Sequence, residues 1–463
     1  GATYNNAALN YSLTTVGLTT TQNFAGGTAA SGLVAVPGEF RRIDIVSGQT
    51  YGHLDVNGAR IIDRSRRSDC TNGVCTYAQE MQNFANWVAW YRSRMQMMKT
   101  SVSRAFQTVD TRYRVGYVTI NNRTESFNNL QISRFNTTQK SNWFDRLFAA
   151  IPNGGTPLRS SLARVGRIYA GQAKINSTDE DPIEYSCQQN FVLLTTDGYW
   201  NEDDTSDTNN SDVRGLDPFG TANRTQIGNQ DASPTPRPYF EGPTATYNTL
   251  ADIAKYLYDT DLRDATRAGY NGTTTADNCS VTGTDDVTGA SFTRNVCENN
   301  VFVTPTDNNT RQHITTFTLG LGMDGNLQFQ DAYQPTTDTN SDFYKLKNGT
   351  GSPTVNWPVP QSGTQTTVDD LWHAAVNGQG RYFSPKDPAE LGNGLAKALA
   401  SITAKTGAGA AAATSTLSPV SGDNFAYVAS YTTAKWTGNL ERRGIDTATG
   451  EVSETAVWCA ESI

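Results

Sequence analysis

The chain has few of the side chains on which most metalloenzymes and nucleic-acid-binding proteins depend. It contains three histidines in 463 residues, which excludes a histidine-rich metal centre. Only 18% of its residues are charged, the formal net charge is −8, and no five consecutive residues are Lys or Arg, so it lacks the basic surface that duplex nucleic acid requires. It also has no apolar run long enough for a membrane-spanning helix. These absences favour a protein that binds proteins, glycans or cations.

The cysteines are few but even in number, six in all. Cys70 and Cys75 are close in sequence, and Cys279 and Cys297 bracket a polar stretch, so two local disulfides would close two surface loops and indicate an oxidising compartment. A zinc site is the alternative, but a Cys pair without a second Cys or His pair nearby is a poor ligand set. The remaining two cysteines bond either to each other or to a missing segment. This last pair would be Cys187–Cys459.

The hydrophobic pattern divides the chain into a polar beginning, a long α/β region and a β-rich end. Residues 1–74 are rich in Thr, Asn and Gly without a helical period, which predicts an irregular or β-rich insertion. Helical and strand patterns alternate over 75–405, which is typical of a doubly wound α/β fold with a mostly parallel sheet. Two polar stretches, 201–247 and 263–311, are long enough to be insertions in that domain.

Individual elements follow from the same pattern. Apolar residues recur every three or four positions from Met81 to Phe106, which predicts one long helix buried against the sheet, although such an aromatic and Met stripe would also suit a cofactor site. The continuous apolar run Phe191–Leu194 predicts a parallel strand covered on both faces. The other predicted helices are 158–168, 250–257, 368–376 and 391–402, and the other predicted strands are 113–120, 314–321 and 381–383.

The composition changes after Ile402. Residues 406–423 have few side chains large enough to pack, which predicts a linker, although their Ala-rich run would also extend the preceding helix. Residues 424–463 alternate as β-strands do and contain no helical pattern. This segment is too short to close a sheet by itself, so we expect the first strands of a second, all-β domain.

Two polar residues fall where an open parallel sheet binds ligands, beyond the carboxyl ends of its strands. Asp197 follows the predicted strand Phe191–Leu194 in a Thr-Asp-Gly turn, and Thr156 precedes the predicted helix 158–168. A carboxylate and a hydroxyl are hard oxygen ligands, which suit Mg²⁺ or Ca²⁺. The plainer interpretation is that Asp197 is a turn residue and Thr156 a helix N-cap.

Two further groups of residues are weaker candidates for a functional site. Asp203, Asp204 and Asp207 form a secondary candidate cation loop, but their spacing does not match an EF-hand, and a solvated acidic loop is the better interpretation. His313 and His373 would be general bases in a secreted hydrolase, yet neither accompanies a Ser or Cys in a recognisable nucleophile elbow. Core or capping histidines are the simpler interpretation.

Several strings resemble known families. GGTPL before a helix, and an apolar strand ending in TDG, resemble a von Willebrand factor A domain, whose metal-ion-dependent adhesion site combines a D-x-S-x-S loop with a Thr and an Asp. The strings DCTNGVCTYAQEMQNFANWVAWYRSRM, TTDGYWN, QHITTFTLGLGMDGNL and YTTAKWTGNLERRGID resemble, in this order, the N-terminal region of the PilC/PilY family of type IV pilus tip adhesins and assembly factors. In that family a β-propeller follows the A-type domain, and here it would begin at 424–463.

The resemblance implies that Thr156 and Asp197 hold a divalent cation, Mg²⁺ or Ca²⁺, in an A-type domain. No D-x-S-x-S string occurs in the chain, since the nearest string, Asp63-Arg64-Ser65, lacks the second Ser. We therefore expect the chain to begin downstream of that motif, without the first strand of the sheet, and to bind the cation weakly or not at all.

The resemblance also implies the partners and the location. The expected partners are minor pilins at the pilus tip and a host-cell or other surface ligand, without nucleic acid. The expected location is extracellular, at the pilus tip or associated with the outer membrane. The implied protein is an adhesin and assembly factor rather than an enzyme. The alternatives are a mechanical spacer with a vestigial metal site and a secreted hydrolase.

Overall fold

The structure is a computed structural model of mixed α/β architecture, with one parallel sheet and several small antiparallel sheets. The chain divides into two compact units, Gly1–Thr100 and Ser101–Ile463. The structure describes residues 9–21, 35–54, 60–61, 67–121, 129–176, 178–201, 227–266, 278–284, 289–301, 303, 307–385, 388–406, 410–414, 425–432, 437–445 and 452–459.

The first unit is mainly antiparallel β-structure. Its elements are β1 (Leu9–Thr21), β2 (Ala35–Asp44), β3 (Thr50–Leu54), β4 (Arg60–Ile61), β5 (Val74–Thr76), α1 (Tyr77–Trp90) and the start of α2 (Arg94–Phe106). β1 pairs with β2, and β3 pairs with both β4 and β5. Tyr51 packs against the Cys70–Cys75 disulfide in a small buried cluster. The α1 helix begins with a capping box between Thr76 and Gln79.

The single long helix predicted from Met81 to Phe106 is wrong, because the structure contains two helices there. The hydroxyl of Ser93 accepts a hydrogen bond from the backbone N–H of Gln96 (3.2 Å), and this local cap starts α2 instead of continuing α1. The apolar stripe is also only partly buried, since Trp87 and Trp90 are 46% and 55% exposed. The expected burial of the whole stripe against a sheet is therefore not observed.

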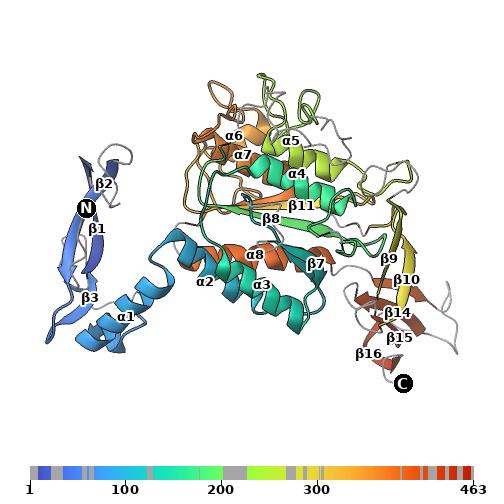
Figure 1. The fold of residues 1–463 in the computed structure, drawn as a ribbon, viewed down its shortest axis with the longest axis horizontal. Coiled ribbons are helices and arrows are strands. Elements are labelled where there is room, and N and C mark those ends of the chain that lie inside the picture. The colour runs from blue at the N-terminus through green and yellow to red at the C-terminus, as the bar shows by residue number, and fades with distance from the viewer. Residues whose placement is uncertain are drawn as a thin grey trace. The chain divides into compact units, whose positions relative to one another are not determined.

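A parallel sheet of three strands lies at the centre of the second unit, in the order β12-β11-β8. β11 is buried along its whole length, as expected for a parallel strand with a neighbour on each side. α4, α5 and α7 lie on one face of the sheet and α8 on the other (Figure 1). The strands are β8 (Asn190–Thr196), β11 (Ile314–Gly320) and β12 (Gln379–Phe383), and the helices are α4 (Leu158–Tyr169), α5 (Leu250–Asp259), α7 (Thr366–Asn377) and α8 (Pro388–Thr406).

These elements confirm the predicted helices and strands from residue 158 to residue 402, with small shifts of their ends. The parallel sheet is narrower than expected, because β6 (Arg114–Tyr117) pairs with β7 (Leu130–Arg134) in a separate antiparallel hairpin. Neither β7 nor α3 (Thr137–Ala149) was predicted. α3 is fixed by Trp143, which stacks on Phe106 with ring centroids 4.5 Å apart. Among the described residues, no helix has both the length and the apolar character needed to cross a membrane.

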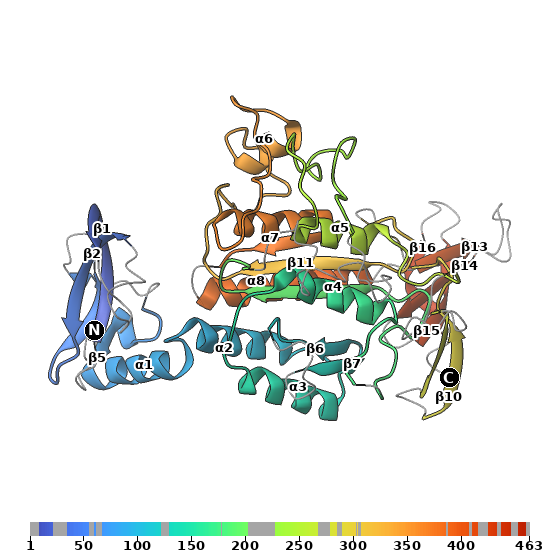
Figure 2. The same ribbon diagram turned by 45° about the horizontal axis from the view of Figure 1, so that its top comes forward.

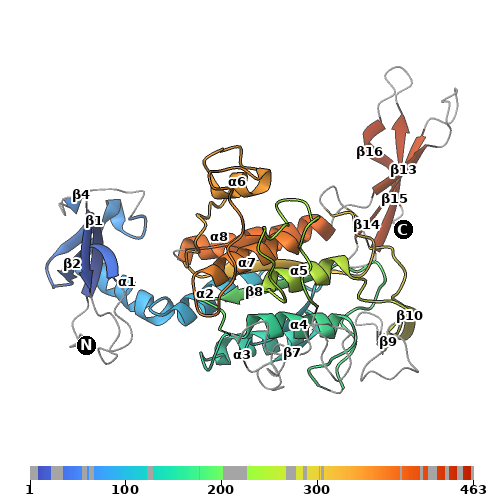
Figure 3. The same cartoon turned by 90° about the horizontal axis from the view of Figure 1, so that it is seen from above.

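Two segments on the α5 and α7 side adjoin each other (Figure 2; Figure 3). One precedes α5, and the other contains α6 (Asp342–Asn348). Arg237 of the first segment donates a hydrogen bond to the carbonyl oxygen of Leu346 in the second (2.9 Å). The indole N–H of Trp357 donates to the carbonyl oxygen of Pro238 (2.8 Å). The described parts of these segments are therefore joined by hydrogen bonds, and both also pack aromatic side chains against the core.

The remaining strands form two antiparallel sheets. β9 (Ser280–Thr284) and β10 (Ser291–Asn295) form a hairpin that the Cys279–Cys297 disulfide closes. The C-terminal sheet has the order β13-β14-β15-β16, and the Ala-rich run expected to be a linker or a helix extension provides its first strand. Its strands are β13 (Ala410–Thr414), β14 (Phe425–Thr432), β15 (Thr437–Ile445) and β16 (Val452–Cys459).

Gly380 in β12 has no room for a side chain, because an added Cβ would lie 2.1 Å from the carbonyl oxygen of Thr316 on β11. We expect Gly380→Ala to lower the free energy of unfolding by ~1–3 kcal/mol, measured by urea denaturation. Gly392→Ala on α8 is the matched control, since no described atom lies within 4 Å of its added Cβ. Ala favours a helix over Gly by up to ~1 kcal/mol, so the control should be neutral or stabilising. Equal effects would contradict the close β11–β12 contact.

Candidate functional site

The two predicted metal ligands lie where β8 ends and where α4 begins. Asp197 directly follows β8 and is exposed, and Thr156 lies two residues before α4 and is half-buried. The backbone N–H of Thr156 donates to Oδ1 of Asn201 (2.5 Å), and the N–H of Asn201 donates to the carbonyl oxygen of Thr156 (3.3 Å). The turn that contains Asp197 is thus fastened to the loop before α4. We call the region formed by Thr156, Asp197 and Asn201 the β8 edge.

The plainer interpretation, a turn residue at Asp197 and a helix N-cap at Thr156, is correct for Asp197 only. Asp197 lies in a bend, as a turn residue would. The N-cap of α4 is Pro157 rather than Thr156, and it has no side-chain hydrogen bond. The Thr156 hydroxyl is therefore not the capping group of that helix, and Thr156 is placed by its backbone contact with Asn201.

Asp370 of α7 joins three segments beneath the β8 edge. Its carboxylate accepts hydrogen bonds from the indole N–H of Trp200 (2.9 Å) and from the backbone N–H groups of Leu250 and Ala251 (3.0 and 3.1 Å). The last two N–H groups begin α5, where a carboxylate is also favoured by the helix dipole. The guanidinium of Arg159 lies 4.4 Å over the ring of Trp200. Burial raises the pKa of Asp370 to about 6, against the opposite effect of its hydrogen-bond donors.

The adjacent Asp369 likewise accepts hydrogen bonds from backbone N–H groups, here those of the segment after β11. It accepts hydrogen bonds from the backbone N–H groups of Asn326 (2.8 Å) and Leu327 (3.0 Å). A Cβ at Gly325 would lie 2.3 Å from Oδ1 of Asp369, so this close approach requires glycine. Burial raises the pKa of Asp369 to about 6. The sequence analysis missed both aspartates, and the signal that points to them is two consecutive acids inside a helix that is buried along most of its length.

More carboxylates are buried in the same region. Asp252 of α5 forms a capping box with Thr249, and Glu241 accepts a hydrogen bond from the backbone N–H of Thr246 (2.7 Å). Burial, together with the neighbouring carboxylates, raises the pKa of Asp252 to about 7 and that of Asp231 to about 8. A small pocket beside them is lined by Glu241, Asp369, Asp370 and Trp357, among others.

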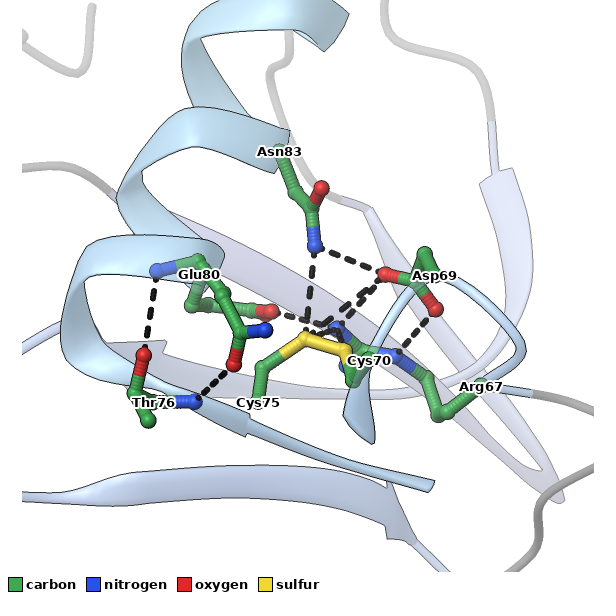
Figure 4. The surroundings of a disulfide bond; sticks show 8 residues. Arg67, Asp69, Cys70, Cys75, Thr76, Glu80 and Asn83 are labelled. Atoms are coloured by element: carbon green, nitrogen blue, oxygen red, sulfur yellow. Dashed lines mark hydrogen bonds and ion pairs between the residues drawn. A yellow bond between two sulfur atoms is a disulfide. The ribbon is translucent and has the colours of Figure 1, made fainter. Parts of the chain in front are cut away.

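A further group of metal-ligand types lies in the first unit, at Asp69, Cys70 and Cys75. The two cysteines are joined as a disulfide, and the guanidinium of Arg67 donates to Sγ of Cys70 (3.1 Å) and to Sγ of Cys75 (2.8 Å) (Figure 4). Arg67 also contacts Asp69 and Glu80. A disulfide lacks the thiolates that bind metals, and Arg67 would repel a cation. This group is therefore a disulfide braced by an ion pair.

Other predicted site residues have mixed outcomes. Asp203, Asp204 and Asp207 lie outside the described residues. Cys187 is a free thiol, so the predicted Cys187–Cys459 disulfide is not formed. Cys187 precedes β8, and burial raises its pKa to about 11, whereas Cys459 ends β16 of the C-terminal sheet. The two local cysteine pairs expected from the sequence are joined.

Both histidines of the hydrolase interpretation are buried, at 3% exposure for His313 and 4% for His373. The ring nitrogens of His313 face the carbonyl oxygen of Arg311 (2.7 Å) and the carboxylate of Asp307 (3.3 Å). Nε2 of His373 bonds to the carbonyl oxygen of Tyr239 (2.9 Å), and burial lowers the pKa of His373 to about 3. Both are therefore core histidines, which was the simpler interpretation of the sequence.

Comparison with known proteins gives three similar relatives, each named type IV pilus biogenesis factor PilY1 of Pseudomonas aeruginosa. The relative from strain PAO1 is 28% identical over 94% of this chain, which is 37% of the relative. The relatives from strains PAK and UCBPP-PA14 are 28% identical over 89% and 85% of this chain, which is 34% and 32% of their lengths. The chain thus spans about a third of the length of these relatives. No protein-family model and no solved structure matches it.

Replacing Asp370 by Asn removes the charge and turns one acceptor oxygen into a donor that faces the first N–H groups of α5. We expect Asp370→Asn to lower the free energy of unfolding by ~1–3 kcal/mol, measured by urea denaturation at pH near 7. Asp259→Asn is the control, because Asp259 is half-exposed and pairs with Lys255 one helical turn earlier. That change should cost less than ~0.5 kcal/mol. Similar small effects for both variants would show that Asp370 does not hold α5.

Proposed function

We propose, on the premise that this chain is a relative of the PilC/PilY family, that it acts in type IV pilus biogenesis at the cell surface. The supporting observation is the similarity to three type IV pilus biogenesis factors over 85–94% of the chain. The two disulfides suit an oxidising compartment outside the cytoplasm. The relatives are named as biogenesis factors, which favours a binding role over catalysis.

We further propose that residues 75–405 form a von Willebrand factor A-like domain. The parallel order β12-β11-β8, with helices on both faces, supports this fold. Asp197 at the carboxyl end of β8, and Thr156 before α4, have the positions that the adhesion site of such a domain uses. In the part of the chain that the structure describes, β8 is paired on one side only. An A-type domain has a further strand beside it, which provides the D-x-S-x-S ligands.

The proposed domain binds its partner through a divalent cation. Thr156 and Asp197 offer a hydroxyl and an exposed carboxylate at the β8 edge, and these hard oxygens suit Mg²⁺ or Ca²⁺. Two ligands are fewer than either ion requires, so the fit depends on further oxygen ligands. A carboxylate from a partner would complete the set, which makes binding cation-dependent and reversible. The proposed partners are minor pilins and a host-cell or other surface ligand at the pilus tip.

The role in pilus biogenesis is tested in the bacterium that makes the protein. Deletion of the gene should remove pili from the cell surface, counted by electron microscopy, and the intact gene should restore them. Restoration by a gene that lacks residues 75–405 would show that this region has no part in the role. An unchanged number of pili after deletion of the gene would refute it altogether.

The cation-binding role is tested by calorimetric titration of Ca²⁺ and of Mg²⁺ into the full-length protein. Asp197→Ala should weaken binding at least about tenfold, because it removes a charged ligand. Asp259→Ala is the control. It removes a carboxylate at the last residue of α5, which is not part of the β8 edge, and should leave binding unchanged. Absence of binding, or equal binding by the two variants, would favour the mechanical spacer with a vestigial site.

A further inference from the structure

Asp231 and Asn377 form a buried pair that joins the segment before α5 to the last residue of α7. Their exposed fractions are 1% and 2%. The amide N–H of Asn377 donates a hydrogen bond to Oδ2 of Asp231 (2.7 Å). The other oxygens of the pair, Oδ1 of Asp231 and Oδ1 of Asn377, are both buried without a hydrogen-bond partner. Two acceptors in adjoining groups therefore lack a donor, which is costly inside a protein.

The surroundings of Asp231 are strongly negative. The carboxylates that act on it are those of Asp252 on α5, Glu241 in the segment before α5, and Asp370 on α7. Nε2 of His373 lies 3.5 Å from Oδ2 of Asp231, but this imidazole is buried and bonds to a backbone carbonyl. An ionised Asp231 would thus add a negative charge to an acidic region without an adjacent cation.

The basic side chains of α4 and α5 interact with groups other than Asp231. Arg159 of α4 acts on Asp370 and stacks on Trp200. Lys255 of α5 forms an ion pair with Asp259. Neither is among the groups that act on Asp231. The charge of Asp231 is therefore not balanced by a basic side chain of α4 or α5.

A directly bound divalent ion does not explain the two oxygens. A metal site needs several ligand atoms within reach of one ion. Within the described ranges, the one set of three His, Cys, Asp or Glu ligand atoms that lie within 4.8 Å of one another is Asp69, Cys70 and Cys75. Asp231 is therefore not part of such a set. The smallest group that can satisfy both oxygens is a proton.

We propose that Asp231 is a neutral carboxylic acid whose O–H, at Oδ1, donates to Oδ1 of Asn377. One proton then satisfies both oxygens, and the acid and the amide form a cyclic pair with two hydrogen bonds. This acid–amide clamp holds the segment before α5 against the end of α7. Ionisation removes the donor and leaves both buried oxygens without one, so the clamp closes at lower pH and loosens at higher pH. The inference does not depend on the proposed function.

The sign of the pH effect follows from proton binding. Burial and the neighbouring carboxylates raise the pKa of Asp231 from 3.8 to about 8 in the folded chain. The folded chain then holds one proton more than the unfolded chain from about pH 4 to about pH 8. The contribution of Asp231 to stability is complete at low pH and falls across that range. At its steepest, the unfolding equilibrium constant rises about tenfold per pH unit.

The test compares Asp231→Asn with the wild-type full chain in urea from pH 5 to pH 8. The Asn amide keeps both hydrogen bonds of the clamp but cannot titrate. The ratio of the wild-type to the variant unfolding constant should rise at least about tenfold across this range. Asp181→Asn is the matched control, since Asp181 is an aspartate paired with the buried Arg263. For that variant the ratio should stay level.

A second measurement reads the proton directly. The carboxyl carbon of Asp231, assigned by its loss in Asp231→Asn, should have the ¹³C chemical shift of a neutral acid at pH 6. The shift of a carboxylate at that pH, or a level ratio for Asp231→Asn, would overturn the proposal. Stabilisation of the wild type by added Ca²⁺ that disappears in Asp231→Asn would also overturn it, in favour of a bound metal ion.

Discussion

The hydrogen bonds from backbone N–H groups to Asp369 and Asp370 are the interaction on which the β8 edge depends. Both α5 and the segment after β11 bury apolar side chains in the core, among them Leu257, Tyr333 and Trp357, but the backbone N–H groups that begin α5 and those of Asn326 and Leu327 also need acceptors. Two adjacent carboxylates on α7 accept these hydrogen bonds. Asp370 accepts from the first N–H groups of α5, and Asp369 accepts from the N–H groups of Asn326 and Leu327. Buried N–H groups without acceptors would be costly, so these bonds add to the apolar packing of the same segments.

This anchoring places the exposed residues of the β8 edge on a fixed support. Trp200 donates to Asp370, and the next residue, Asn201, bonds to the backbone of Thr156. The turn that contains Asp197 is therefore held by α7 through Trp200 and by the loop before α4 through Asn201. A rigid frame under exposed oxygen ligands suits the proposed cation-dependent binding, and both histidines are buried.

The sequence predicted those elements whose apolar residues are periodic, such as α4, α5, β8 and β11. It failed where a local polar group decides the outcome, since the Ser93 cap divides the expected long helix. It also predicted the end of β8 before Asp197 and the start of α4 after Thr156, because both boundaries are visible in the apolar pattern. The buried role of Asp370 was not predictable in this way, because its partner Leu250 lies 120 residues away in the chain.

Amide hydrogen exchange tests the central claim most directly, because it reports the N–H groups themselves. The account predicts that the N–H groups of Leu250, Ala251, Asn326 and Leu327 exchange slowly and open together, although they lie in a first helical turn and a loop. They should be protected to the same degree as neighbouring core amides. Exchange of these four groups at the rate of exposed loop amides would contradict the account.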